Sequence, residues 1–271
     1  MPNKGLTLGE WYQQTHLPAS EKRGFLRHFL GLNQIQTMTR TALVLTESQM
    51  EDLSQAVQRR LSGEPFPYIV GYQEFFSRTF LVNPTVLIPR PDTECLIEWV
   101  IENTPQQAKV VDLGTGSGCI AITLKLERPD LEVIATDISK EALSTAQENA
   151  KRLGAQIIFY LGCWLDALPK DEQIDVIVSN PPYIEKNDDH LRQLTFEPLS
   201  ALTDHGSGLG CINSILEEAS AFPSVTLIAI EHGWNQGASV RSLAKEKGFQ
   251  GARTFRDYGN NDRFTVWQKV S

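Results

Sequence analysis

Along the first 63 residues, apolar positions recur every three or four residues, which is the spacing of one face of an α-helix. The clearest repeat follows Thr46, a predicted N-cap, because Gln49 stands three residues later as a capping-box partner. The apolar positions of this helix are Met50, Leu53, Val57 and Leu61. Ser20 is the expected cap of an earlier helix. The pattern predicts a small all-α bundle whose apolar stripes form its core.

From residue 108 onward, short apolar runs of strand length alternate with segments of helical period. The runs that predict strands are 110–113, 131–135, 157–160, 174–179, 225–230, 251–255 and 264–268. This alternation predicts an α/β fold with a doubly wound, mainly parallel seven-stranded sheet, covered by helices on both faces. Ligands of such sheets bind beyond the carboxyl ends of the strands, near the topological switch point.

Between these two regions, apolar and aromatic runs at 72–76 and 79–82 predict a β-hairpin, and Asp92 is the expected cap of the helix that follows. We therefore expect a helical domain at 1–71, a hairpin linker at 72–86 and the α/β domain at 87–271.

Composition limits the possible functions of the protein more than it limits the possible folds. Hydrophobic residues make up 41% and charged residues 21% of the 271 positions, as in an ordinary soluble globular protein. No apolar run approaches a membrane span and the N-terminus lacks a signal-peptide core, so we expect no membrane partner. The four cysteines form no Cys-x-x-Cys pair and the histidines lack metal-ligand spacing, which favours a reducing cytoplasm and predicts no metal.

The net charge of −8 lies entirely beyond residue 75. Residues 1–75 hold 7 basic and 7 acidic side chains, whereas residues 76–271 hold 18 and 26. Extended binding to a nucleic-acid duplex normally leaves a basic footprint, and the sequence shows none. The charge distribution therefore argues against a nucleic-acid partner.

A glycine loop follows the first strand of the predicted sheet. It consists of Gly114, Thr115, Gly116, Ser117 and Gly118. The spacing G-x-G-x-G fails the dinucleotide fingerprint, and no Gly-Lys-Ser/Thr follows that would indicate a phosphate-binding loop. Asp137 ends the next strand, where a carboxylate can accept two ribose hydroxyls. Together these features favour a nucleoside without phosphates, with S-adenosylmethionine as the obvious candidate.

The run Asp175–Ser179 predicts a buried strand that breaks into Asn180, Pro181, Pro182 and Tyr183. Two prolines fix φ and remove backbone donors, so this stiff turn presents carbonyls, one carboxamide and one aromatic ring. Such a site suits a planar NH2 group. Two further roles stay open at this point: Asp112 either forms the strand-end turn or faces the methionine ammonium, and Trp164 is either core or stacks on adenine.

Seven stretches of the chain match one family pattern. They are 63–65, 87–94, 112–118, 178–184, 196–199, 231–234 and 256–259. On these motifs the sequence resembles the class I S-adenosylmethionine-dependent methyltransferases, and within them the HemK/PrmC family, the glutamine methyltransferases of peptide chain release factors. The resemblance runs across nearly the whole chain, including the helical region.

The resemblance implies N5-methylation of the glutamine of a Gly-Gly-Gln motif in translation termination, with S-adenosylhomocysteine as the product. It implies that the loop Gly114–Gly118 holds the cofactor, that Asp137 binds its ribose and that Trp164 lies by the adenine. It also implies that Asn180 touches both cofactor and substrate, and that the turn 180–183 holds the glutamine. The family often has an acidic residue where this chain has Cys163, which puts one adenine hydrogen bond in doubt.

As a mechanism, we expect the Asn180 side-chain oxygen and the Pro181 carbonyl to accept the two amide N–H bonds of the glutamine, with Tyr183 packed on the amide plane. The turn contains no His, Lys or carboxylate, so no general base is required there. The proton can leave after methyl transfer.

Two alternatives remain at this stage: an N6-adenine or N4-cytosine methyltransferase, whose base amine would fit the same turn, and a non-catalytic S-adenosylmethionine-binding adaptor. The acidic α/β region argues against the first, and the intact turn 180–183 argues against the second. We expect a cytoplasmic monomer that acts on release factors, with the helical domain recognising that partner.

Overall fold

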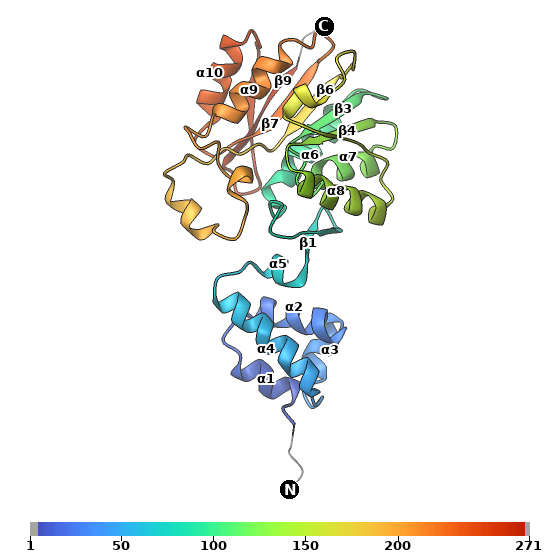
Figure 1. The fold of residues 1–271 in the computed structure, drawn as a ribbon, viewed down its shortest axis with the longest axis vertical. Helices are drawn as coiled ribbons and strands as arrows, with labels where there is room; N and C mark the ends of the chain where they lie inside the picture. The colour runs from blue at the N-terminus through green and yellow to red at the C-terminus, as the bar shows by residue number, and fades with distance from the viewer. Residues whose placement is uncertain (1–4, 269–271) are drawn as a thin grey trace. The chain divides into compact units, whose positions relative to one another are not determined.

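A computed structural model describes residues 5–268, which form two compact units that divide between Gly71 and Tyr72. None of the helices within residues 5–268 is long and apolar enough to cross a membrane. Figure 1 draws both units as a ribbon coloured along the chain.

The first unit is all helical. Its helices are α1 (Leu8–Gln14), α2 (Ala19–Leu30), α3 (Gln34–Thr39), α4 (Glu47–Leu61) and α5 (Phe66–Val70). The predicted capping box at Thr46 and Gln49 is confirmed, because each side chain bonds the backbone N–H of the other. The bundle core is built from Leu8, Trp11, Phe25, Leu26 and Leu53, all of them buried.

Two details of the predicted bundle are wrong. Leu61 is 62% exposed, because it lies in the last turn of α4, beyond the part of the helix that buries Leu53 and Ala56. Ser20 does not cap α2, which begins one residue earlier at Ala19 with Pro18 in the cap position. A proline before the first helical residue already fixes φ there, so no side-chain cap is needed to start the helix.

The second unit is a seven-stranded sheet between two layers of helices (Figure 1). Its strands are β3 (Lys109–Leu113), β4 (Glu132–Asp137), β5 (Ile158–Leu161), β6 (Val176–Ser179), β7 (Leu227–Glu231), β8 (Arg253–Arg256) and β9 (Asp262–Gln268). The order in the sheet is β5-β4-β3-β6-β7-β9-β8, and only β9 runs antiparallel to its neighbours. All seven predicted strands are confirmed, and the switch point falls between β3 and β6.

The helices of this unit are α6 (Asp92–Asn103), α7 (Cys119–Glu127), α8 (Lys140–Leu153), α9 (Gly210–Ala219) and α10 (Gly237–Glu246), with short 3-10 turns η1 (Trp164–Ala167), η2 (Asp189–Gln193) and η3 (Leu199–Ala201). Successive residues of a strand point to opposite faces, and β3 shows this directly. Val110 joins the apolar cluster under α6 and α7, whereas Val111 and Leu113 join the cluster under α9 and α10. Both faces are therefore apolar, as a parallel sheet requires.

The hairpin β1 (Tyr72–Phe75) and β2 (Arg78–Leu81) belongs to the second unit. Phe75 and Phe80 are buried in the apolar cluster under α6 and α7, with their ring centroids 6.0 Å apart. The side chain of Asn149 on α8 bonds both the N–H and the carbonyl of Leu81, at 2.7 and 3.0 Å. The hairpin is thus packed structure of the α/β unit.

Candidate active site

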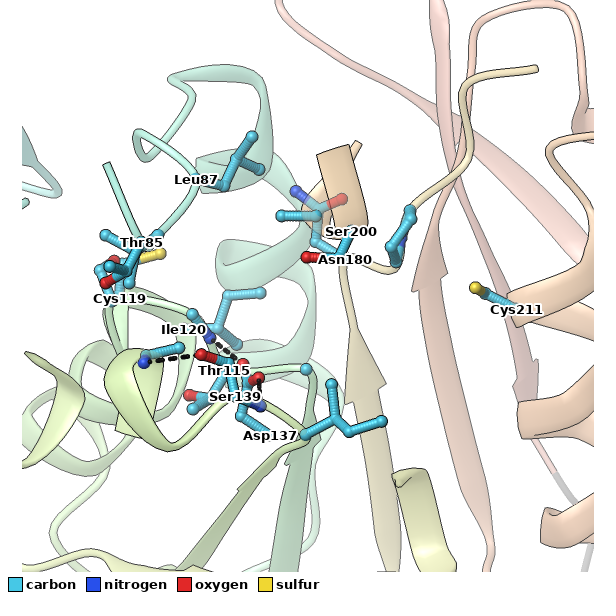
Figure 2. Close-up of a pocket in the computed structure, with 18 of the residues that line it drawn as sticks. Thr85, Leu87, Thr115, Cys119, Ile120, Asp137, Ser139, Asn180, Ser200 and Cys211 are labelled. Atoms are coloured by element: carbon cyan, nitrogen blue, oxygen red, sulfur yellow. Dashed lines mark hydrogen bonds between the residues drawn. The ribbon is translucent and has the colours of Figure 1, made fainter. Parts of the chain in front are cut away.

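A cavity of about 370 Å³ opens at the carboxyl ends of β3, β4 and β6. Its wall brings together side chains from the loops after these three strands and from the segment before α6 (Figure 2). The lining includes Gly114, Thr115, Gly116, Ser117, Asp137, Trp164, Asn180 and Pro182. The position matches the rule that doubly wound sheets bind ligands at the switch point.

The glycine loop is fixed by backbone hydrogen bonds to the neighbouring strand. The N–H groups of Gly114 and Thr115 both donate to the carbonyl of Thr136 on β4, at 2.9 Å. Gly114, Gly116 and Gly118 have φ of 72°, 58° and 83°, a region that L side chains rarely adopt. A Cβ at Gly116 would meet nothing within 4 Å, so its backbone faces open space from which a ligand can approach closely.

Asp112 stabilises this loop by hydrogen bonds from the end of β3. Its Oδ2 accepts hydrogen bonds from the Thr115 hydroxyl at 2.6 Å and from the Ala121 N–H at 3.2 Å. The side chain is fully buried, and burial raises the pKa of this carboxyl to about 7, against the opposing effect of both hydrogen bonds. Asp112 does not line the cavity, so of the two roles left open by the sequence, the structure favours the turn-forming one.

Asp137 presents a prepared carboxylate at the end of β4. Its Oδ2 accepts from the Gly116 N–H and its Oδ1 from the Ser139 N–H, both at 2.9 Å. Burial raises the pKa of Asp137, and these backbone donors oppose the rise. Each oxygen keeps a lone pair for a second donor, so the group fits a ribose diol.

Trp164 forms a side wall of the cavity. It begins η1 with φ of 39°, which is unusual for a side chain of its size. A Cβ at Gly114 would lie 3.1 Å from its ring, so the indole packs directly over the glycine loop. Cys163 lines the same cavity and is exposed. The flat indole of Trp164 lies beside the glycine loop, whose backbone carries no side chain at its glycines, and this arrangement fits a planar base such as adenine.

The end of β6 and the turn after it are bonded to four other segments of the chain. The Ser179 hydroxyl donates to the Leu113 carbonyl at 2.7 Å, which joins the ends of β6 and β3. The Asn180 Nδ2 donates to the Thr93 hydroxyl at 3.2 Å, which leaves Asn180 Oδ1 as an acceptor. The Tyr183 hydroxyl donates to Glu231 Oε1 at 3.3 Å, and Gln236 donates to the Tyr183 carbonyl at 2.9 Å.

Two family models match this chain. One, described as the PrmC N-terminal domain, matches residues 13–71, and the other, described as the methyltransferase small domain, matches residues 91–207. A release factor glutamine methyltransferase of Neisseria gonorrhoeae is 44% identical over 265 residues, which cover 96% of this chain and 97% of the relative. The chain belongs to the release factor glutamine methyltransferases. The family resemblance expected from the sequence is confirmed.

A second release factor glutamine methyltransferase, from Escherichia coli, is 40% identical over 94% of this chain and 93% of its own length. Among solved structures, the catalytic domain of hMettl16 in complex with an RNA hairpin has a TM-score of 0.62 at 16% identity, over 93% of this chain and 90% of that chain. At that identity the likeness concerns the fold alone. It confirms the class I methyltransferase fold.

The structure does not place every predicted site residue at the cavity of this family member. Gly118, Pro181 and Tyr183 lie outside the lining. Gly118 caps α7, and a Cβ there would lie 2.8 Å from the Ile122 side chain, so close packing requires this glycine. Pro181 is buried and Tyr183 points its hydroxyl toward Glu231. The roles of all these residues stay predictions.

Three residues that support the site were missed or given no role by sequence reasoning. Asn149 is fully buried and donates to the Ser117 carbonyl at 2.9 Å, so it ties the glycine loop to the hairpin. Its signal was a polar residue on the buried face of a helix, next to Ala146 and Ala150. Thr93 and Glu231 are the others, and nothing local in the sequence indicates that they meet the turn at 180–183.

Glu197 holds the segment before α6. Its carboxylate accepts from the Ile88 N–H at 3.0 Å and pairs with Arg90. Leu87, Pro89 and Arg90 line the cavity, so Glu197 shapes that wall from behind. In the same region Asp92 is not the cap of α6 but its first residue, because Pro91 holds the cap position and the carboxylate pairs with Arg263 at 3.1 Å.

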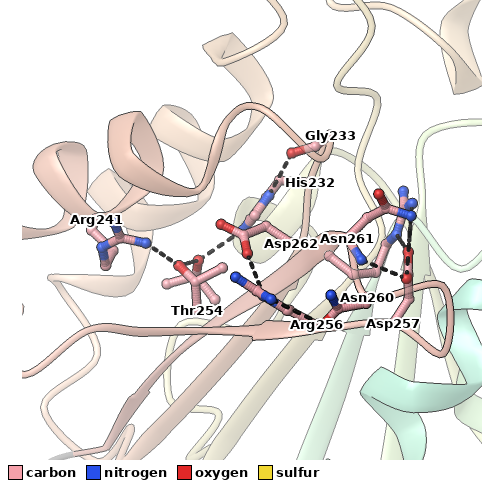
Figure 3. Close-up of polar contacts among 11 residues, drawn as sticks. His232, Gly233, Arg241, Thr254, Arg256, Asp257, Asn260, Asn261 and Asp262 are labelled. Atoms are coloured by element: carbon pink, nitrogen blue, oxygen red, sulfur yellow. Dashed lines mark hydrogen bonds and ion pairs between the residues drawn. The ribbon is translucent and has the colours of Figure 1, made fainter.

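A second polar network joins the end of β7 to β8 and β9 (Figure 3). His232 is fully buried, and its ring bonds the Gly233 carbonyl at 2.9 Å and the Thr265 hydroxyl at 2.8 Å. Burial lowers the pKa of this histidine, so it is a neutral structural link between β7 and β9. Within residues 5–268, no cluster of three or more His, Cys, Asp or Glu side chains could hold a metal ion.

Proposed function

We propose that this protein transfers the methyl group of S-adenosylmethionine to the side-chain amide nitrogen, N5, of a glutamine in a peptide chain release factor. The observation that carries the proposal is the placement of Asn180. Its Nδ2 is anchored on Thr93, so its Oδ1 remains an acceptor at the cavity wall beside the glycine loop. A carboxamide oxygen there suits a planar N–H donor as substrate.

The residues around the cavity fit the methyl donor. Backbone of Gly114–Gly118 would lie against it, Asp137 would accept the two ribose hydroxyls and Trp164 would stack on the adenine. The family's implied acidic contact to adenine is replaced by Cys163. When bound, the sulfonium supplies an excellent leaving group, so the protein's contribution rests on position and polarity.

The chain's own groups then act on the glutamine amide, whose nitrogen lone pair is delocalised into its carbonyl. Asn180 Oδ1 and the Pro181 carbonyl would accept its two N–H bonds, which favours lone-pair density on the nitrogen and directs it into the cavity. The ring of Tyr183 would limit rotation of the amide plane. No side chain of this turn needs to take the proton before the methyl group is transferred.

The helical unit recognises the release factor, since a lone glutamine side chain offers little specificity. The protein acts as a monomer in the cytoplasm and needs no nucleic acid. The even charge balance of residues 1–75 and the acidic remainder support the last point, because a nucleic-acid site normally carries excess Lys and Arg.

The test uses radiolabelled S-adenosylmethionine with a release factor, with DNA and with ribosomal RNA, each after nuclease treatment of the enzyme. Label should enter only the release factor, at a glutamine. Asn180→Ala should lower turnover about 100-fold or more, because one fixed polar contact at the reacting group is removed. The dissociation constant of S-adenosylmethionine should rise only a few-fold.

Asn103→Ala is the matched control, since Asn103 ends α6 and its side chain donates to the carbonyl of Trp99 in the same helix. It should keep full turnover. Label in nucleic acid alone, or near-normal turnover by Asn180→Ala, would overturn the proposal. Sedimentation of the enzyme alone checks the monomer.

A further inference from the structure

A buried carboxyl lies behind the turn at 180–183, and the mechanism above does not use it. Glu231 ends β7, the strand next to β6, and only 1% of its surface is exposed. Its Oε1 accepts the Tyr183 hydroxyl at 3.3 Å. Within the part of the chain that the structure describes, its Oε2 has no hydrogen-bond partner at standard distance and angle. A buried carboxylate is costly, so its position calls for a reason.

Thr93 connects this carboxyl to Asn180. Thr93 lies in the first turn of α6, is 2% exposed and accepts the Asn180 Nδ2 at 3.2 Å. The Thr93 hydroxyl also stabilises the charged form of the nearby Glu231 carboxyl, although the two groups do not reach standard hydrogen-bond geometry. A hydroxyl has a single proton, and when that proton points at the carboxylate, only lone pairs remain for Asn180. The carboxamide must then offer its NH2 to Thr93 and turn its oxygen away.

The charged groups around Glu231 keep it available as an acceptor. Burial raises its pKa to about 7, Arg263 on β9 lowers the pKa, and Asp92 on α6 raises it. Arg263 is itself fixed by Asp257 at 2.8 Å and by Asp92 at 3.1 Å. Tyr183 and Cys119 are the other titratable groups that face this carboxyl. Above neutral pH, Glu231 is therefore ionised and accepts hydrogen bonds.

We propose that Glu231 is a positioning residue: it selects the orientation of the Asn180 carboxamide through Thr93 and holds Tyr183 through its hydroxyl. The inference deepens the proposed function and rests on it for the role of Asn180. Without the carboxylate, the Thr93 proton can point at Asn180, and the carboxamide can flip. A flipped Asn180 presents N–H groups to the substrate N–H, which repels the glutamine amide.

Kinetics at pH 8 test the relay with four variants. Glu231→Gln keeps the shape but replaces one carboxylate oxygen by an NH2 donor, so it cannot present an acceptor oxygen to both Tyr183 and Thr93, and kcat should fall about 10- to 100-fold through misplaced geometry. The dissociation constant of S-adenosylmethionine should stay within about 2-fold. Thr93→Val should lose a similar factor, whereas Thr93→Ser retains the hydroxyl and should recover turnover to within about 3-fold of wild type.

The matched control is Asp175→Asn, a carboxylate at the opposite end of the sheet that accepts the Lys109 N–H at 2.8 Å. It should keep kcat per folded molecule. The double variant Glu231→Gln with Thr93→Val should lose less than the product of the two single losses, because both changes act on Asn180 through one relay. Losses that multiply, or a Glu231→Gln enzyme within 2-fold of wild type, would overturn the inference.

A second measurement needs no substrate. In ¹⁵N spectra, the side-chain NH2 of Asn180, assigned by its absence in Asn180→Asp, should exchange with solvent about 10-fold faster in Glu231→Gln than in wild type. Equal exchange in both proteins would overturn the inference. If wild-type enzyme fails to methylate a release factor, the proposed function is wrong, and the exchange rates still decide the role of Glu231.

Discussion

Asp112→Asn should change how the stability of the α/β unit depends on pH. Asp112 is fully buried beneath the glycine loop, and burial raises its pKa from 3.8 to about 7. Between these two values the folded state holds a proton that the unfolded state has released. The free energy of unfolding therefore falls as the pH rises from about 4 to about 7, and is flat above.

The size of this effect follows from the two pKa values. Between pH 5 and pH 8, a carboxyl with these values in the unfolded and folded states removes about 2 to 3 kcal/mol of stability. Asparagine has nearly the same shape and cannot ionise, so the variant lacks this loss. It gains an NH2 without a partner, which costs about 1–3 kcal/mol, but that cost is the same at both pH values.

The measured quantity is the stability of Asp112→Asn relative to wild type, compared at pH 8 and pH 5. It should be about 2–3 kcal/mol more favourable at pH 8. The contribution of Glu231, whose pKa is also raised to about 7, is present in both proteins and cancels. Urea unfolding followed by tryptophan fluorescence suits the measurement, since four of the five tryptophans lie beyond residue 71.

Asp171→Asn, at an exposed position, controls for the change in net charge and should show no such difference between the two pH values. If wild type and Asp112→Asn lose stability in parallel from pH 5 to pH 8, Asp112 is not the buried titrating group described above. The reasoning would then be refuted whatever the absolute stabilities are.

Two further predictions concern packing. In urea unfolding, Gly118→Ala should destabilise the protein by about 1–3 kcal/mol more than Gly154→Ala. Both glycines have positive φ, but only a Cβ at Gly118 meets neighbouring side chains within 4 Å. Equal losses of stability would contradict the close approach of α7 and α8. Leu53→Ala should cost about 3 kcal/mol, since Leu53 is fully buried, whereas Leu61→Ala should change stability by less than about 0.5 kcal/mol in the same measurement. A large loss of stability in Leu61→Ala would show that Leu61 belongs to the core of the bundle.

Much of the fold follows from local patterns. The strands were recognisable because a buried parallel strand is a short run of apolar residues, such as 176–179. The starts of helices such as α4 and α8 were recognisable because an N-cap residue precedes each of them. Element ends were less certain. Pro18 and Pro91 took the cap positions expected for Ser20 and Asp92, because a proline can begin a helix without a side-chain cap.

The site could be predicted only in part. The glycine loop and the turn at 180–183 are each contiguous, so their backbone chemistry is visible in the sequence. The supporting contacts are not contiguous. Thr93 and Asn180 are separated by 87 positions, and Tyr183 and Glu231 by 48. Such pairs depend on the strand order and on how α6 packs against β7, which no local pattern specifies.

The hydrogen bond from Ser179 to Leu113 has a consequence for how this catalyst can vary. Leu113 leads into the loop proposed to hold the methyl donor and Ser179 into the turn proposed to hold the acceptor, and the two residues are paired in adjacent strands. Neighbouring strands lie about 4.8 Å apart, a spacing that side chains hardly alter. The spacing of the strands therefore fixes the distance between the two loops that follow β3 and β6. Other loops and added domains can be exchanged to suit new substrates without a change in that distance.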